Sequence, residues 1–266
     1  MTRPTSRKSR STLLHVAAAP LVFFLAFPFA AVVLSLSPAR LLADLQSEAA
    51  LKALVLTMQT TLVATAITIV AGTPLALLLA RRRFRGREII DTLVDLPITV
   101  PPVVGGVALL LAFGRRGLIG RSIDAFGIQI PFSTAAVVMA QVFIASPFFV
   151  KAARAGFEAV PARLEAAART LGASPWHTFW TVTVPLARPA LLAGAVLCWA
   201  RALSEFGATM MFAGNLPGRT QTLALAVMSA MESDLDTALA ISTLALLLGI
   251  AALILAKSWA RRTIPS

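Results

Sequence analysis

Residues 53–80 read ALVLTMQTTLVATAITIVAGTPLALLLA and contain no Asp, Glu, Lys or Arg. A helix needs roughly 20 mostly apolar residues to cross the hydrocarbon core of a bilayer, so this stretch predicts a transmembrane helix. Four further runs lack these charged residues, at 11–39, 96–114, 125–150 and 237–256. A sixth apolar run, 189–212, is interrupted only by Arg201 and Glu205. We therefore expect six membrane spans, at about 13–36, 54–80, 96–113, 132–151, 188–212 and 237–257.

The composition of the whole chain also favours a membrane protein. Of its 266 residues, 58% are hydrophobic and 14% are charged, whereas a soluble domain has about 45–50% apolar and about 25% charged residues. The same abundance of apolar residues excludes a disordered chain. Cys198 is the single cysteine, so neither an intrachain disulfide nor a thiolate zinc cluster can form. His15 and His177 lie far apart in the sequence, and we expect no metal site and no cofactor.

The distribution of positive charge predicts how the spans are oriented. The chain has 24 Lys and Arg against 12 Asp and Glu, a net charge of +12. With a cytoplasmic N-terminus, 17 of the Lys and Arg residues fall in cytoplasmic segments and 6 in outer segments, which is the bias typical of membrane proteins. Residues 1–10 then form a basic cytoplasmic tail, residues 11–260 form one membrane domain, and both termini are cytoplasmic. The alternative is a cleaved signal peptide, but the first run exceeds the roughly 7–15 apolar residues that such a peptide contains.

The third span opens with an irregular stretch that contains Pro97, Pro101, Pro102, Gly105 and Gly106. These residues prevent a regular helix there. One interpretation is a kinked element beside a water-filled path, because freed backbone groups within a membrane must face protein or water. The other is an entry loop whose prolines simply start the helix. The sequence leaves both interpretations open.

The fifth span contains the charged residues Arg201 and Glu205. They lie four residues apart, so on a helix they share a face and can pair, with Ser204 beside them. Each charge alone would cost about 2.5–3.5 kcal/mol at the centre of a membrane helix. Their presence in the span therefore indicates a structural or functional role. The pair either fixes packing between spans or subunits, or it lines a path and offers the Arg201 charge to a passing anion.

Enzyme motifs are missing from the sequence. It contains no His-Glu-x-x-His, no Gly-x-Ser-x-Gly and no Walker motif. Glu205 is the only carboxylate well inside a span, so an intramembrane pair of facing carboxylates is absent too. We expect no catalytic residue, and a membrane-embedded hydrolase stays a remote alternative.

The loop at 152–187 is the most informative part of the chain. Pro161 suits the first turn of a short helix, and Gly172 suits the position that ends it. Ser174 followed by Pro175 predicts the start of a second helix, and we expect Pro185 to end this unit. One apolar face of the second helix would carry Trp176, Phe179 and Trp180. Such a unit either enters a cleft on a soluble partner or lies at the membrane interface.

This loop resembles the conserved cytoplasmic loop of ABC importer permeases. That family carries Glu-Ala-Ala, three residues, Gly, nine residues and then Ile-x-Leu-Pro. Here Gly172 is followed by nine residues and then by Val-Thr-Val-Pro at 182–185. The family's Glu position is Ala166, and Glu165 lies one residue earlier. The resemblance implies contact with an ATPase through a coupling loop (152–187) that includes Pro161, Leu164, Glu165, Ala166, Ala167, Ala168, Leu171, Gly172, Ser174, Trp176 and Pro185.

Further blocks are similar to one group within that family. The similarity extends over roughly residues 50–260 and is strongest at 95–106, 113–120, 200–209 and 212–222. These blocks resemble permeases for molybdate, tungstate and sulfate, and we favour molybdate. Tungstate and sulfate or thiosulfate are the alternatives.

The resemblance implies an all-α integral membrane protein with six transmembrane helices in the bacterial plasma (inner) membrane. Such a permease is not itself an enzyme. Two copies form a homodimeric pore, two copies of a separate ABC ATPase subunit hydrolyse ATP, and an extracytoplasmic binding protein delivers the oxyanion. Transport proceeds by alternating access, and no nucleic acid takes part. We expect the translocation path or an intramembrane pair at Pro101, Pro102, Arg201, Ser204 and Glu205.

Overall fold

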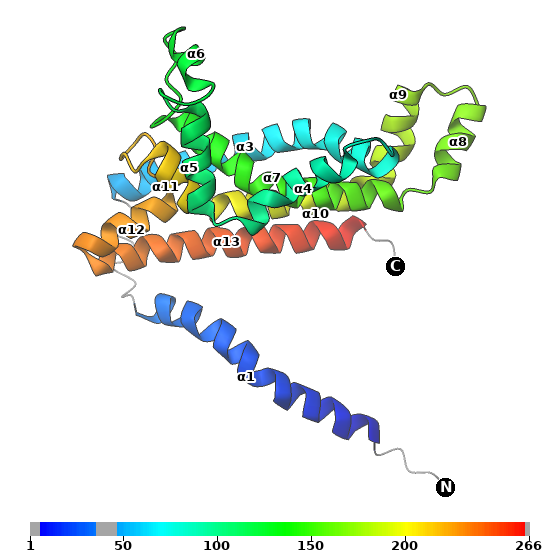
Figure 1. The fold of residues 1–266 in the computed structure, drawn as a ribbon. Coiled ribbons are helices and arrows are strands. Elements are labelled where there is room, and N and C mark those ends of the chain that lie inside the picture. Colours follow the sequence, from blue (N-terminus) through cyan, green and yellow to red (C-terminus); the bar gives the residue numbers. More distant parts are fainter. Residues whose placement is uncertain (1–5, 36–46, 264–266) are drawn as a thin grey trace.

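The structure is a computed structural model that describes residues 6–35 and 47–263 (Figure 1). These described residues form helices and no strand, which confirms the predicted all-α fold. The helices are α1 (Ser6–Leu34), α3 (Glu48–Arg81), α4 (Arg87–Thr99), α5 (Pro102–Phe113), α6 (Gly120–Asp124), α7 (Thr134–Ala159), α8 (Ala162–Thr170), α9 (Pro175–Thr178), the π-helix η1 (Phe179–Thr183), α10 (Val184–Leu203), α11 (Gly207–Ala213), α12 (Leu223–Ser233) and α13 (Leu235–Thr263).

Four long helices, α3, α7, α10 and α13, run side by side, and α7 packs against both α3 and α10 (Figure 1). Small residues allow α7 and α10 to approach closely. A Cβ added to Gly194 of α10 would lie 2.8 Å from the Cβ of Ala152, and one added to Gly156 of α7 would lie 2.5 Å from the Cβ of Ala190. Membrane helices associate through such close packing, because lipid gives them no hydrophobic driving force.

A stripe of buried threonines on α3 adds polar contacts within the bundle. The hydroxyls of Thr57, Thr60 and Thr61 each donate to a backbone carbonyl four residues earlier. They also accept hydrogen bonds from Leu223 N (2.8 Å), Gln141 Nε2 (3.2 Å) and Trp199 Nε1 (3.1 Å), respectively. Since a hydroxyl can donate and accept at once, these threonines tie α3 to α12, α7 and α10. No local pattern in the sequence predicts these contacts.

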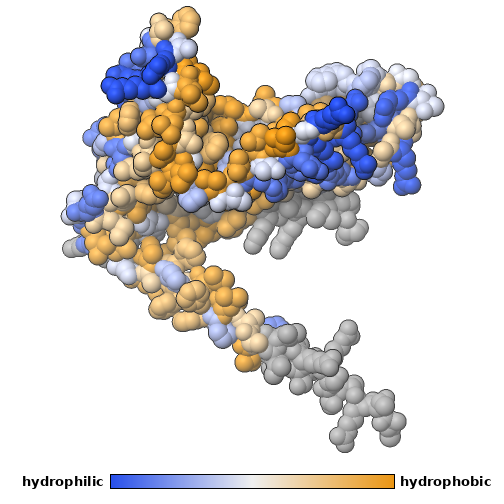
Figure 2. All heavy atoms as spheres, viewed as in Figure 1, coloured by the Kyte–Doolittle hydropathy of each residue, from blue (hydrophilic) through white to orange (hydrophobic). Residues whose placement is uncertain are grey.

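Five described helices are long and apolar enough to cross a membrane, and α4 with α5 makes a sixth span if the bent pair is counted as one. The five are His15–Leu34 within α1, α3, α7, the continuous helix Pro175–Leu203, and Leu235–Ile254 within α13. Hydrophilic residues gather at the end of the bundle that holds α8 and at the tip that holds α6, with apolar residues between them (Figure 2). This arrangement agrees with the predicted six-span membrane fold.

The third span differs from the single run predicted at 96–113. α4 already begins at Arg87 and ends at Thr99, and α5 begins at Pro102 with its axis turned by 119°. Pro101 is the N-cap of α5 and Pro102 its first residue, where the missing proline N–H costs no hydrogen bond. The prolines therefore do start a helix, and they also mark a sharp break in the span.

The fifth span, predicted at 188–212, differs at both ends. α9, η1 and α10 form one continuous helix, so Pro185 does not end the loop unit as predicted. The Val184 N–H bonds to the Phe179 carbonyl, five residues back, in a π-turn. Pro185 follows in the first turn of α10, a position that suits proline. At its other end α10 stops at Leu203, and the chain resumes in α11.

Ion pairs join α4 to α7 in an antiparallel ladder. Its rungs are Asp95 with Lys151 (2.8 Å), Asp91 with Arg154 (2.6 Å) and Arg87 with Glu158 (3.9 Å). These residues recur every three or four positions, so each helix presents one charged face to the other. Carboxylates of α4 thus neutralise Lys151 and Arg154, which the sequence analysis counted among the cytoplasmic positive charges. The ladder holds the first half of the broken span on α7.

Candidate functional site

One end of the bundle carries a helix–turn–helix unit, which we call the loop unit (α8, residues 171–174 and α9; Figure 1). Gly172 ends α8 with φ at 89°. The Gly172 N–H donates to the Arg169 carbonyl, and the Ala173 N–H donates to the Ala168 carbonyl, each at 3.0 Å. This Schellman motif satisfies the last carbonyls of α8. A Cβ at Gly172 would meet nothing within 4 Å, so the left-handed backbone, not space, requires glycine.

The second helix of the loop unit starts where the sequence predicted. Ser174 Oγ accepts a hydrogen bond from the His177 N–H at 3.2 Å, and Pro175 is the first helical residue. The Trp176 ring lies 6.0 Å from the Phe179 ring and 5.6 Å from the Trp180 ring. The three aromatic side chains therefore form the predicted cluster on one side of the helix.

The outward side of the loop unit exposes large apolar side chains. Leu171 is 89% exposed and Trp176 is 70% exposed, and Leu164 is exposed as well, as is Trp180 of η1, just beyond the loop unit. Large apolar residues gathered at a polar end of a protein indicate an interaction surface. The structure places the other predicted loop residues as follows: Pro161 is the N-cap of α8, Ala166, Ala167 and Ser174 are exposed, and Glu165 and Ala168 are half-buried.

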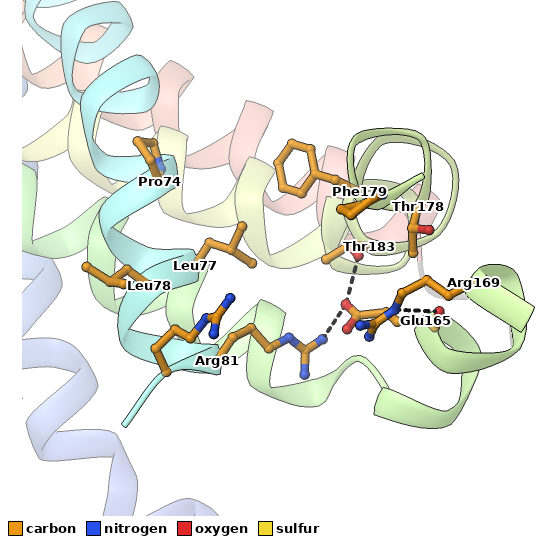
Figure 3. Close-up of a pocket in the computed structure, with 11 residues that line it drawn as sticks. Pro74, Leu77, Leu78, Arg81, Glu165, Arg169, Thr178, Phe179 and Thr183 are labelled. Atoms are coloured by element: carbon orange, nitrogen blue, oxygen red, sulfur yellow. Dashed lines mark hydrogen bonds and ion pairs between the residues drawn. The ribbon is translucent and has the colours of Figure 1, made fainter. Parts of the chain in front are cut away.

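Glu165 points inward, toward the ends of other helices (Figure 3). Its Oε1 accepts hydrogen bonds from Arg81 Nη2 at 2.7 Å and from Thr183 Oγ1 at 2.8 Å. Arg81 Nη2 also donates to the Val160 carbonyl at 3.2 Å. The ends of α3 and α7, the helix α8 and the π-turn therefore meet at one carboxylate. Neither Arg81 nor Thr183 was predicted to belong to this site. The one feature of the sequence that could have pointed to Arg81 is its position directly after the charge-free run 53–80.

A cleft of about 410 Å³ lies between α3 and the loop unit (Figure 3). Its polar wall includes Arg81, Glu165 and Thr183, and α3 contributes the apolar side chains Leu77 and Leu78. Because this space separates α3 from the loop unit, α8 is joined to α3 by polar contacts, not by close apolar packing.

Arg201 and Glu205, the second predicted group, lie where α10 ends, at the opposite end of the bundle from the loop unit (Figure 1). Arg201 Nη2 donates to Glu205 Oε2 at 3.0 Å, so the predicted ion pair is present. The predicted shared helix face is wrong, because Ser204 caps α10 and Glu205 lies beyond it. Ser204 Oγ donates back to the Arg201 carbonyl at 3.1 Å.

The Glu205 side chain is fully buried, with 0% exposure. Its second oxygen, Oε1, accepts a hydrogen bond at 2.7 Å from the N–H of Ala208, near the start of α11. Both carboxylate oxygens are therefore occupied by groups of the protein itself. This geometry favours a structural role for the pair, in which Glu205 fixes α11 to the end of α10.

α11 in turn packs against α5, the second half of the broken span. A Cβ added to Gly106 would lie only 2.7 Å from the carbonyl oxygen of Ala208. A Cβ added to Gly207 would lie 3.2 Å from the Cβ of Pro102. The structure thus brings Pro102 and its neighbour Pro101 close to the turn that follows Glu205, although they are about a hundred residues apart in sequence.

A model of the binding-protein-dependent transport system inner membrane component family matches residues 72–265. The chain is 41% identical over 243 residues to the molybdenum transport system permease protein ModB of Mycobacterium tuberculosis, covering 91% of each chain. It is 40% identical over 188 residues to ModB of Azotobacter vinelandii, covering 70% of this chain and 83% of that one. ModB of Escherichia coli K12 is 38% identical over 183 residues, covering 68% and 80%.

Solved structures share the fold at low sequence identity. A bacterial alginate ABC transporter, solved in complex with a pentasaccharide-bound periplasmic protein, contains a chain that matches with a TM-score of 0.76 and 16% identity, covering 98% of each chain. The MetNI methionine ABC transporter contains one with a TM-score of 0.64 and 17% identity, covering 83% of this chain and all of that one. The chain therefore belongs to the binding-protein-dependent transport system inner membrane components, as the permease subunit of an ABC importer.

Proposed function

We propose that this permease imports molybdate by alternating access, driven by ATP hydrolysis on a separate subunit. Two copies of the chain would form the pore, two ATPase subunits would bind at the loop unit, and an extracytoplasmic protein would deliver the oxyanion. The observation that carries the proposal is the similarity, at 38–41% identity, to relatives named as molybdenum permeases. Tungstate and sulfate or thiosulfate are the competing substrates.

Uptake of labelled molybdate by a deletion strain carrying this chain tests the substrate. We expect uptake to depend on the chain, to be competed by molybdate and tungstate, and to persist in excess sulfate. Uptake abolished by excess sulfate would instead assign the chain to the sulfate permeases. Uptake that continues when the ATPase subunit is inactivated would overturn the ATP-driven mechanism.

We also propose that both termini are cytoplasmic. The charge asymmetry of the sequence supports this orientation, as does the end of α13, which lies at the same end of the bundle as the loop unit (Figure 1). A reporter that is active only in the periplasm should be silent when fused after Pro265. The same reporter inserted at Gly127, between α6 and α7, should be active, and the reverse pattern would invert the topology.

Docking of the ATPase on the loop unit makes Gly172 sensitive to substitution. Gly172→Val forces a β-branched residue into the left-handed region, which costs about 1–2 kcal/mol and disturbs the end of α8. We expect at least about tenfold lower uptake, with normal membrane insertion. Gly86→Val is the matched control, because Gly86 also has φ 89° and open space around it but lies outside the loop unit. Equal uptake by both variants would contradict docking here.

A further inference from the structure

Burial does not explain what holds α8 in place. None of its residues is buried, and Leu164 is exposed. Nine residues are also too few to form a stable helix alone in water, since isolated helices shorter than about 12–15 residues are marginal. The position of α8 therefore depends on its capped ends and on its polar contacts.

Those polar contacts converge on Glu165. Arg81 connects it to the end of α3 and also bonds to the Val160 carbonyl, the C-cap of α7. Thr183 connects it to the π-turn that leads into α10. The side chains of Glu165 and Arg81 are only 13% and 24% exposed, so water screens this ion pair less than a surface pair. One carboxylate thus fixes α8 relative to three spans.

Because Glu165 points inward, the outward face of the loop unit carries no acidic side chain from α8. Glu165 is the only acidic residue between 159 and 204. Arg163 of α8 is exposed. Arg169 lies on the same helix face as Glu165, lines the cleft, and its Nε donates to the Glu165 carbonyl at 3.2 Å (Figure 3). Together with Leu171 and Trp176, Arg163 gives the outward face of the loop unit an apolar and cationic character.

We propose that Glu165 is a positioning residue, which holds α8 on three spans through Arg81 and Thr183, and that the face left for the ATPase fits an apolar cleft bearing carboxylates. This inference rests on the proposed docking of the ATPase at the loop unit. The loop's acidic residue then sets the angle at which α8 meets the partner and makes no contact with it.

Variants of the purified complex, reconstituted with its ATPase and binding protein, test the positioning role. We expect Glu165→Gln and Arg81→Gln each to lower substrate-stimulated ATP hydrolysis at least about fivefold while the affinity for the ATPase subunit is kept. The effect of the double variant should be smaller than the sum of the two single effects, because both remove the same ion pair. Arg81→Lys, which keeps the charge, should restore part of the stimulation.

The role of the outward face is tested by reversing its charge. Arg163→Glu should weaken binding of the ATPase subunit at least about tenfold, and higher salt should weaken wild-type binding. Arg85→Glu is the control, since Arg85 is an exposed arginine at the same end of the bundle but outside the loop unit.

Separate outcomes would overturn the two proposals. If Glu165→Gln weakens ATPase binding and Arg81→Gln does not, Glu165 contacts the partner and the positioning role is wrong. If Arg163→Glu leaves ATPase binding unchanged, the proposed carboxylate-bearing cleft is wrong. If the wild-type chain neither binds an ATPase subunit nor stimulates it, the proposed function itself fails.

Discussion

Replacing Glu205 with alanine should abolish transport and sharply reduce the amount of folded permease. The change leaves the Arg201 guanidinium without its carboxylate and the N–H of Ala208 without its acceptor. Removing one partner of a fully buried pair costs about 3–5 kcal/mol, and the cost here is at the lower end because the Arg201 side chain is 23% exposed. The measurements are the yield of monodisperse protein in detergent and the uptake of molybdate.

Glu205→Gln is the matched control, because its amide oxygen can still accept from the Ala208 N–H. It should retain more folded protein than Glu205→Ala. Exchanging the two charges should not rescue the fold, since an arginine at position 205 would direct donors at the N–H of Ala208. A Glu205→Ala variant that folds normally and fails only in transport would show that the pair lines the path, and the structural role would be wrong.

A second large effect is expected at Gly106. Gly106→Val should also abolish uptake, because its Cβ would lie 2.7 Å from the carbonyl oxygen and 2.8 Å from the Cα of Ala208. Both contacts are with backbone, so α5 and α11 must separate, and overpacking of this kind typically costs about 1–3 kcal/mol or more. Loss of the monodisperse peak in detergent and loss of uptake would be measured together.

Gly249→Val in α13 is the control for the Gly106 prediction. Nothing lies within 4 Å of a Cβ placed at Gly249, so the same substitution should be tolerated there. Normal uptake by Gly106→Val would show that transport does not require close contact between α5 and α11.

The sequence predicted the helices of the membrane domain because the bilayer imposes a simple rule. Backbone groups in lipid must be satisfied within the segment, so a long charge-free run such as 53–80 has to be helical. The end of α8 and the start of α9 were predictable for a similar reason, since Gly172 and Ser174 act on backbone groups a few residues away. Local chemistry decides each of these features.

Contacts between distant residues were not predictable from one sequence. Arg81 and Glu165 are 84 residues apart, and nothing local marks them as partners. The spacing of Arg201 and Glu205 predicted the pair, but not that the chain leaves the helix at Ser204. The prolines predicted an irregular start to the third span, but neither the 119° turn between α4 and α5 nor the close approach of Gly106 to Ala208, which are properties of the packed structure.

The continuity of α9, η1 and α10 has a mechanical consequence. The helix from Pro175 to Leu203 contains 29 residues, which corresponds to a rod of about 43 Å. If such a rod tilts by about 5° around one end, its other end moves by about 4 Å. A small rocking at Trp176, near one end of this helix, would therefore shift the turn that holds Glu205, beyond the other end.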